Sequence, residues 1–176
     1  MDLLKRRWTA LVCAVGLCAG LTLPAAAAGT YVDVPGGAWY ADEVSQVTEK
    51  GYMTGVDPTH FVPLANVTRA TVVTVLWRMA GSPAPSASSG FSDVAAEAWY
   101  TQAVDWAKEK KIASGDGKGA FHPDQQITRE EMAVLLARYD AYQGIDMAEG
   151  ALNLFSDANQ ISSWAKEGVQ HAVGMG

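Results

Sequence analysis

Two arginines, 60 residues apart, are the side chains of this sequence that are best suited to bind an anion. Arg69 and Arg129 each follow a threonine, which is a good helix N-cap. Free backbone N–H groups at a helix start attract an anion, and a guanidinium beside them binds a carboxylate through two parallel hydrogen bonds. An internal ion pair with Asp33, Asp93 or Glu131 is the alternative, and the two roles are compatible. We predict that these arginines form the centre of an anion-binding site.

Tryptophan and aspartate residues recur with the same spacing and join the candidate site. Trp39 and Trp99 offer flat apolar faces on which a sugar ring can stack, although their spacing from nearby alanines is equally consistent with core packing. Asp33 and Asp93 precede predicted helices. An N-capping role is therefore the simpler prediction for them, and contact with a ligand is the second.

A glycine-rich segment, residues 115–119, contributes Gly115 and Lys118 to the candidate ligand-binding residues. It lacks the Gly-Lys-Ser/Thr of a P-loop and the alternating acids of a calcium loop, so we expect a turn whose N–H groups and lysine assist the anion site. We predict no metal, no cofactor and no catalytic residue, because no triad or metal-ligand spacing occurs. Three histidines at unmatched positions are predicted to be incidental surface residues: His60, His122 and His171.

The candidates recur because the chain repeats itself with a period of 60 residues. Tyr31–Ala80 aligns with Phe91–Asp140 without a gap, and 15 of the 50 aligned positions are identical. We expect a third copy, which begins at Phe155, to be truncated. Repeats of this length cannot bury a core alone and stack into arrays with equivalent surfaces. The repetition therefore favours a binding module over a catalyst, which needs one unique cleft.

Each full repeat is predicted to be a helix, a loop and a second helix. Apolar residues three and four apart, starting at Trp99, predict the first helix of repeat two. The loop contains a Phe-x-Pro motif whose Phe we expect to fill the core between the helices. The second helices begin at Thr68 and Thr128, and Glu131 completes a capping box only in repeat two. The buried stripes of these second helices are predicted to be Val72, Val75, Leu76 and Met79, and Met132, Leu135, Leu136 and Tyr139.

The N-terminus is predicted to be a signal peptide, residues 1–28. Three basic residues precede an uncharged apolar stretch from Trp8 to Leu23, and Ala26-x-Ala28 satisfies the small-x-small rule for cleavage. A membrane anchor is less favoured because the stretch is short for a bilayer. Both cysteines lie in this segment, so we expect no disulfide in the mature chain.

The net charge of the mature chain limits its partners, and the linkers set the predicted domain boundaries. After cleavage the chain has 10 basic and 18 acidic residues, a net charge of −8, which argues against nucleic acid or anionic membranes as partners. No further stretch is long enough to span a membrane. We predict a mainly α fold of tandem helix-loop-helix repeats with these boundaries: signal peptide 1–28, repeat one 29–82, flexible-to-extended linker 83–90, repeat two 91–142, linker 143–154 and incomplete repeat three 155–176.

Six ordered motif elements resemble a known family. Phe-Ser-Asp-Val (91–94), Trp-Tyr (99–100), a glycine loop ending in Phe-His-Pro-Asp (115–124) and Ile-Thr-Arg-Glu-Glu (127–131) occur in this order. They resemble the S-layer homology domain, whose pattern is roughly Phe-x-Asp-Val, Trp, Gly-x-Gly-x-Phe-x-Pro and Thr-Arg-Ala-Glu, typically in three tandem copies. Repeat two fits closely, and repeat one departs in its loop and at Thr71.

The resemblance implies a non-covalent cell-wall anchor. Such domains fold as a pseudo-threefold arrangement and bind secondary cell-wall polysaccharide, often pyruvylated, in grooves between repeats. They tether an S-layer protein or an exported enzyme to the envelope. The implied location is therefore the cell surface, and the implied partners are the wall polysaccharide and an S-layer or passenger protein.

Other classes of function stay open at this point. The repeats are also consistent with a structural, self-assembling or protein-interaction module of the S-layer. The anchor part of a truncated exported wall enzyme is another alternative. A wall-acting hydrolase is a further hypothesis, because the mature chain has enough acids to supply a carboxylate pair.

Overall fold

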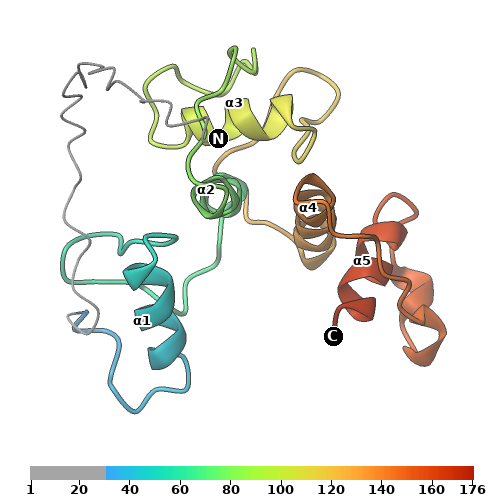
Figure 1. The fold of residues 1–176 in the computed structure, drawn as a ribbon, viewed down its shortest axis with the longest axis horizontal. Coiled ribbons are helices and arrows are strands. Elements are labelled where there is room, and N and C mark those ends of the chain that lie inside the picture. Colours follow the sequence, from blue (N-terminus) through green and yellow to red (C-terminus); the bar gives the residue numbers. More distant parts are fainter. Residues whose placement is uncertain (1–30) are drawn as a thin grey trace, which may run out of the picture.

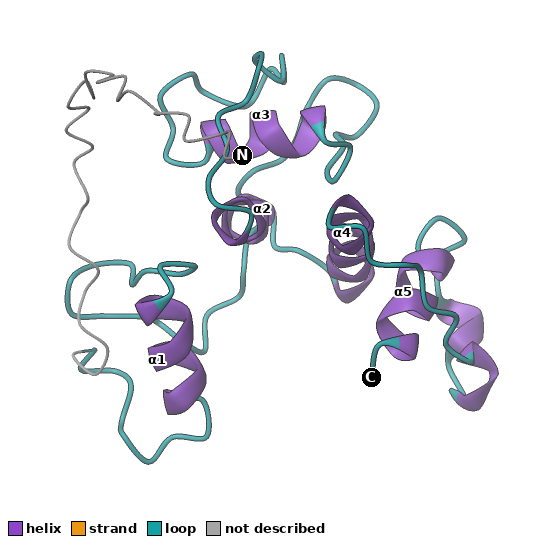
Figure 2. Ribbon diagram, viewed as in Figure 1, coloured by secondary structure: helices purple, strands orange, loops and turns teal. Residues whose placement is uncertain are grey.

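The fold consists of helices and long loops. The computed structural model describes residues 31–176, so the predicted signal peptide lies outside the described residues (Figures 1 and 2). Within that range there is no strand, and an isolated bridge pairs Thr68 with Gln126. The mainly α prediction is confirmed. The elements in chain order are α1 (Ala41–Glu49), α2 (Arg69–Met79), α3 (Thr101–Glu109), α4 (Arg129–Tyr142), the short 3-10 turns η1 (Leu152–Leu154) and η2 (Ala158–Gln160), and α5 (Lys166–Gly174).

Helices pack across the repeat boundaries. The second helix of repeat one, α2, packs against the first helix of repeat two, α3, and α4 packs in the same way against α5. Figure 1 shows α2 in the middle of the molecule, between α1, α3 and α4. Each repeat therefore depends on its neighbour for its buried surface, as expected of a stacked array.

The main core lies between α2, α3 and the loop that follows α3. Trp106 and Phe121 are fully buried, and the ring of Phe91 lies 5.6 Å from that of Phe121. The predicted core role of the Phe-x-Pro phenylalanine is therefore confirmed in repeat two. The other members of this core are Val72, Val73, Leu76, Ala103, Val104, Ala107, Ile112, Ala113, Leu135 and Tyr139.

Several predicted core positions are instead at the surface. Trp39 and Trp99 are 84% and 63% exposed, so the core-packing alternative is wrong. Trp99 lies in a turn before α3, which begins at Thr101, and its side chain is therefore not on the apolar face of that helix. Met79 and Leu136 are also exposed, at 43% and 40%, whereas Leu76 is buried.

Hydrogen bonds hold the linker between the repeats at both of its ends. The indole N–H of Trp77 donates to the Pro83 carbonyl at 2.9 Å. Further along, the backbone N–H of Ser89 donates to the carboxylate of Asp105, a buried acid of α3, at 2.6 Å. These bonds fix both ends of the linker to the helices that it joins.

The C-terminal segment packs onto α4 through a buried histidine. His171 is 1% exposed, and its Nδ1 accepts the backbone N–H of Ala148 at 3.0 Å. Its Nε2 must therefore carry the proton, which it donates to Asp140 at 2.9 Å. The prediction of an incidental surface histidine is wrong here. The assignment of residues 155–176 to a third repeat stays a prediction.

Candidate functional site

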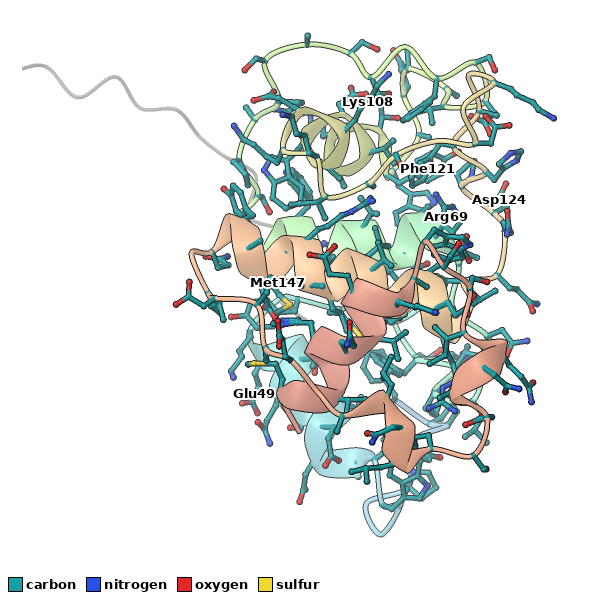
Figure 3. All side chains as sticks on the ribbon, turned by 90° about the vertical axis from the view of Figure 1, so that its right-hand side faces the viewer. Glu49, Arg69, Lys108, Phe121, Asp124 and Met147 are labelled. Atoms are coloured by element: carbon teal, nitrogen blue, oxygen red, sulfur yellow. The ribbon has the colours of Figure 1, made fainter. Side chains whose placement is uncertain are left out.

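Arg69 reaches from repeat one into repeat two. Its Nε donates to the Phe121 carbonyl at 3.0 Å, its Nη2 to the Ser114 carbonyl at 3.1 Å and its Nη1 to Glu131 at 2.8 Å. The guanidinium also lies 5.0 Å from the centre of the Phe121 ring, and the two side chains are neighbours in Figure 3. The internal ion pair considered from the sequence is therefore present, with Glu131 as its acid.

The backbone at the start of α2 is also occupied by repeat two. The N–H of Arg69 donates to the Gln125 carbonyl at 2.9 Å, and that of Ala70 donates to the Pro123 carbonyl at 3.0 Å. The Thr68 hydroxyl caps the N–H of Thr71. The expectation that free N–H groups here would attract an anion is wrong, because the loop of the next repeat has already satisfied them.

Asp33 and Asp93, which occupy the same position in the two repeats, hold the Phe-x-Pro loops in place. Asp93 accepts the backbone N–H groups of Phe121 at 2.8 Å and His122 at 2.7 Å, and Asp33 makes the equivalent pair of bonds in repeat one. The predicted N-capping role is therefore wrong. Burial alone would raise the pKa of Asp93, but these N–H bonds together lower it below its ordinary value.

Gly115 begins a tight loop that a side chain would disrupt. A Cβ there would collide with the Ala120 carbonyl oxygen and would lie 2.6 Å from the Phe91 ring. The next residue, Asp116, accepts the N–H groups of Lys118 at 2.7 Å and Ala120 at 3.1 Å. The backbone N–H of Lys118 is therefore already used within the loop.

These elements surround a pocket of about 200 Å³, called here the Arg69 pocket. Repeat one supplies Arg69, and the C-terminal segment supplies Trp164, which is 58% exposed. Of the predicted site residues, Arg69 and Gly115 line the pocket, and Trp39, Trp99, Asp33, Asp93, Lys118 and Arg129 do not. Repeat two supplies the other lining residues: Ser114, Gly115, Asp116, His122, Gln125, Glu131, Val134, Leu135 and Arg138.

Arg138 is the less restrained cation of the Arg69 pocket. A guanidinium has five N–H donors, and Arg69 uses three of them on protein acceptors, so two remain. Arg138 is exposed and makes one long hydrogen bond, 3.5 Å, to the Ile112 carbonyl. The pocket can therefore offer N–H donors from two guanidinium groups to one carboxylate.

Arg129 lies in different surroundings from Arg69, although the two are equivalent in sequence. It is exposed and lines a groove of about 730 Å³ between α4, α5 and the loop before α2. Among the hydrogen bonds and ion pairs of residues 31–176, none involves its guanidinium. Apolar side chains dominate the groove, including Phe155, which is 49% exposed.

Sequence reasoning placed only Arg69 and Gly115 of the pocket lining in the candidate site, and four of the lining residues that it missed are informative. Arg138 had a signal, because it matches Arg78 among the identical positions of the repeats. Trp164 had a weaker one, since it aligns with Trp99 after one inserted residue. Ser114 contributes through its backbone carbonyl, and His122 has no counterpart in repeat one, so neither was detectable from the repeat pattern.

We expect the free energy of unfolding to fall as the pH drops from about 4 to about 2. The N–H groups of Lys118 and Ala120 hold the pKa of Asp116 down at about 2 in the folded state, against about 3.9 in an unfolded chain. The stability that Asp116 contributes is therefore present above about pH 4 and is lost as the pH falls towards about 2. Urea unfolding between pH 2 and 5 should show a smaller decline in the free energy of unfolding for Asp116→Asn than for the wild type. Equal declines in the two proteins would show that Asp116 does not cause the loss.

Two features of residues 31–176 bear on other functions. Within residues 31–176, no three His, Cys, Asp or Glu side chains lie close enough together to hold a metal ion. The helices in that range are too short or too polar to cross a bilayer.

Tandem all-helical repeats that build one pocket across their junction define a repeat-type binding module. The sequence profile of the S-layer homology domain matches residues 30–73 and 90–133. The chain belongs to the S-layer homology family, whose members are cell-envelope anchoring modules, and it is a secreted cell-surface protein.

Several longer proteins contain a region that is similar in sequence to this chain. The chain is 31% identical over 172 residues to the surface-layer 125 kDa protein of Lysinibacillus sphaericus, which covers 97% of the chain and 14% of that protein. It is 32% identical over 163 residues to an S-layer protein of Bacillus thuringiensis subsp. finitimus, 91% of the chain and 19% of that protein. It is also 32% identical over 139 residues to an amylopullulanase of Thermoanaerobacterium thermosulfurigenes. This match spans 78% of the chain and 7% of that protein.

Proposed function

We propose that the chain anchors a cell-surface protein by binding an acidic secondary cell-wall polysaccharide in the Arg69 pocket. The observation that carries the proposal is the pocket itself, where two arginines and an exposed tryptophan converge from three segments of the chain. An S-layer protein and an amylopullulanase share this region, which favours a common binding role separate from any catalysis.

The pocket suits a sugar that carries a pyruvate ketal. Arg138 and the remaining N–H groups of Arg69 would hold the ketal carboxylate, since guanidinium groups bind carboxylates through charge-assisted bonds. Trp164 presents an indole face on which the apolar side of the sugar ring stacks. Glu131 keeps the Arg69 guanidinium in place and prevents it from turning into solvent.

We expect Trp164→Ala to weaken binding to purified cell-wall polysaccharide about tenfold or more, because an aromatic anchor at a site contributes a large share of the affinity. Trp39→Ala is the matched control, since Trp39 is 84% exposed and lines neither the pocket nor the groove. Mild acid, which removes the ketals, should abolish wild-type binding. Undiminished binding to the stripped polymer would refute the pyruvate assignment, and equal losses for both tryptophans would refute the pocket.

The groove beside Arg129 supports a second candidate, a protein-interaction module. Its walls expose Leu136 and Phe155, whose counterparts Leu76 and Phe91 are buried, so it presents an unusual amount of apolar surface. Sedimentation of the purified protein separates the two functions. Oligomers that form without polysaccharide, and that disappear in Leu136→Glu, would support the second candidate.

A further inference from the structure

Two carboxylates, those of Asp93 and Asp116, flank His122 in the Arg69 pocket. Its Nε2 lies 3.2 Å from the Asp116 carboxylate, and its Nδ1 lies 3.9 Å from Asp93. Its imidazole is 47% exposed, so it is accessible to a ligand. The backbone φ of His122 is +60°, the same as that of Val62 in repeat one. The loop conformation therefore does not require a histidine at this position.

The charges around the pocket favour an anion less strongly while His122 is neutral than when it is protonated. The loops contribute Asp93 and Asp116, α4 contributes Glu131 and Arg138, and α2 contributes Arg69. Three carboxylates and two guanidinium groups give a local charge of −1. Hydrogen bonds from backbone N–H groups keep both aspartates ionised, with the pKa of Asp116 at about 2. One added proton on His122 brings the local charge to zero.

We infer that His122 is an acid-dependent ligand-binding residue, whose imidazolium neutralises Asp93 and Asp116 and strengthens the hold of the pocket on an anionic sugar. The inference rests on the proposed function, because it concerns the same pocket and an anionic ligand. An imidazole changes its charge between about pH 5 and 8. The anchor therefore binds more tightly in a mildly acidic envelope than in a neutral one.

The test measures the affinity of the purified protein for a synthetic hexose glycoside with a pyruvate ketal and no amino group, by calorimetry at pH 5.5 and 7.5. The carboxylate of this probe stays ionised across that range. We expect the wild type to bind about tenfold more tightly at pH 5.5, the size of a single charge-assisted contact. The methyl ester of the same ketal, which carries no charge, should show no such difference.

Two variants separate His122 from the other histidines. His122→Val, which copies Val62 of repeat one, should bind with the weaker affinity at both pH values. His60→Ala should keep the full pH dependence, because His60 pairs with Asp57 away from the pocket. A wild-type affinity that is equal at both pH values, or a pH dependence that survives in His122→Val, would overturn the inference and leave the proposed function intact. No binding of the ketal at either pH would overturn both.

Discussion

Replacement of Arg69 by methionine is expected to lower the free energy of unfolding by about 2–4 kcal/mol. Methionine keeps the apolar stem but leaves Glu131 without a cation, and the carbonyls of Phe121 and Ser114 without their donors. The Arg69 and Glu131 side chains are 12% and 20% exposed, so water replaces the lost partners poorly. Chemical denaturation followed by tryptophan fluorescence measures the change.

The equivalent substitution at Arg129 is the matched control for this experiment. Arg129 occupies the same position in its repeat, but it is exposed and makes no ion pair within residues 31–176, so we expect a change below about 0.5 kcal/mol. The double variant Arg69→Met, Glu131→Gln should recover part of the loss, because it removes the unpaired charge. Equal effects at the two arginines would show that Arg69 is not the structural link between the repeats.

Replacement of Phe121 by alanine is expected to cost about 3–5 kcal/mol, the range for a large aromatic side chain removed from a core. Phe121 is fully buried, packs on Phe91 and supports the guanidinium of Arg69. The cavity would lie directly beneath the Arg69 pocket, so we expect ligand affinity to fall together with stability. The same denaturation assay, run beside calorimetry with the ketal glycoside, measures both effects.

Phe61 provides the internal comparison for Phe121. It is the same residue of the same motif and also packs on an aromatic, Tyr31 at 5.4 Å, but it is partly exposed. Within residues 31–176, no arginine lies over its ring in the way that Arg69 lies over Phe121. Phe61→Ala should therefore cost about 1–2 kcal/mol, in proportion to its smaller buried area. A larger loss at Phe61 than at Phe121 would contradict the location of the main core between α2 and α3.

Local patterns in the sequence were sufficient to predict the helices and the loops. Thr128 and Glu131 predicted the capping box at the start of α4, and both of its hydrogen bonds are present. The repeated Phe-x-Pro motif predicted a core phenylalanine, which is Phe121. These predictions succeed because a helix cap and an apolar face depend on residues only three or four positions apart.

Predictions that depended on distant partners were less successful. The aspartates were expected to cap nearby helices, but Asp93 bonds to backbone N–H groups 28 and 29 residues further along. Trp99 was expected either in the core or at the ligand, and it lies in an exposed turn outside the pocket. No local pattern carries information about which loop a side chain will meet.

The sequence by itself determined the family, the helix-loop-helix repeat and the pair of arginines that mark it. Only the tertiary structure decided that these two arginines differ. Arg69 meets the loop of repeat two, with Glu131 as its partner, whereas Arg129 faces an open apolar groove. The physical reason is that each repeat completes its neighbour: the groups that surround an arginine come from about 45 to 62 residues further along the chain, beyond the reach of any local pattern.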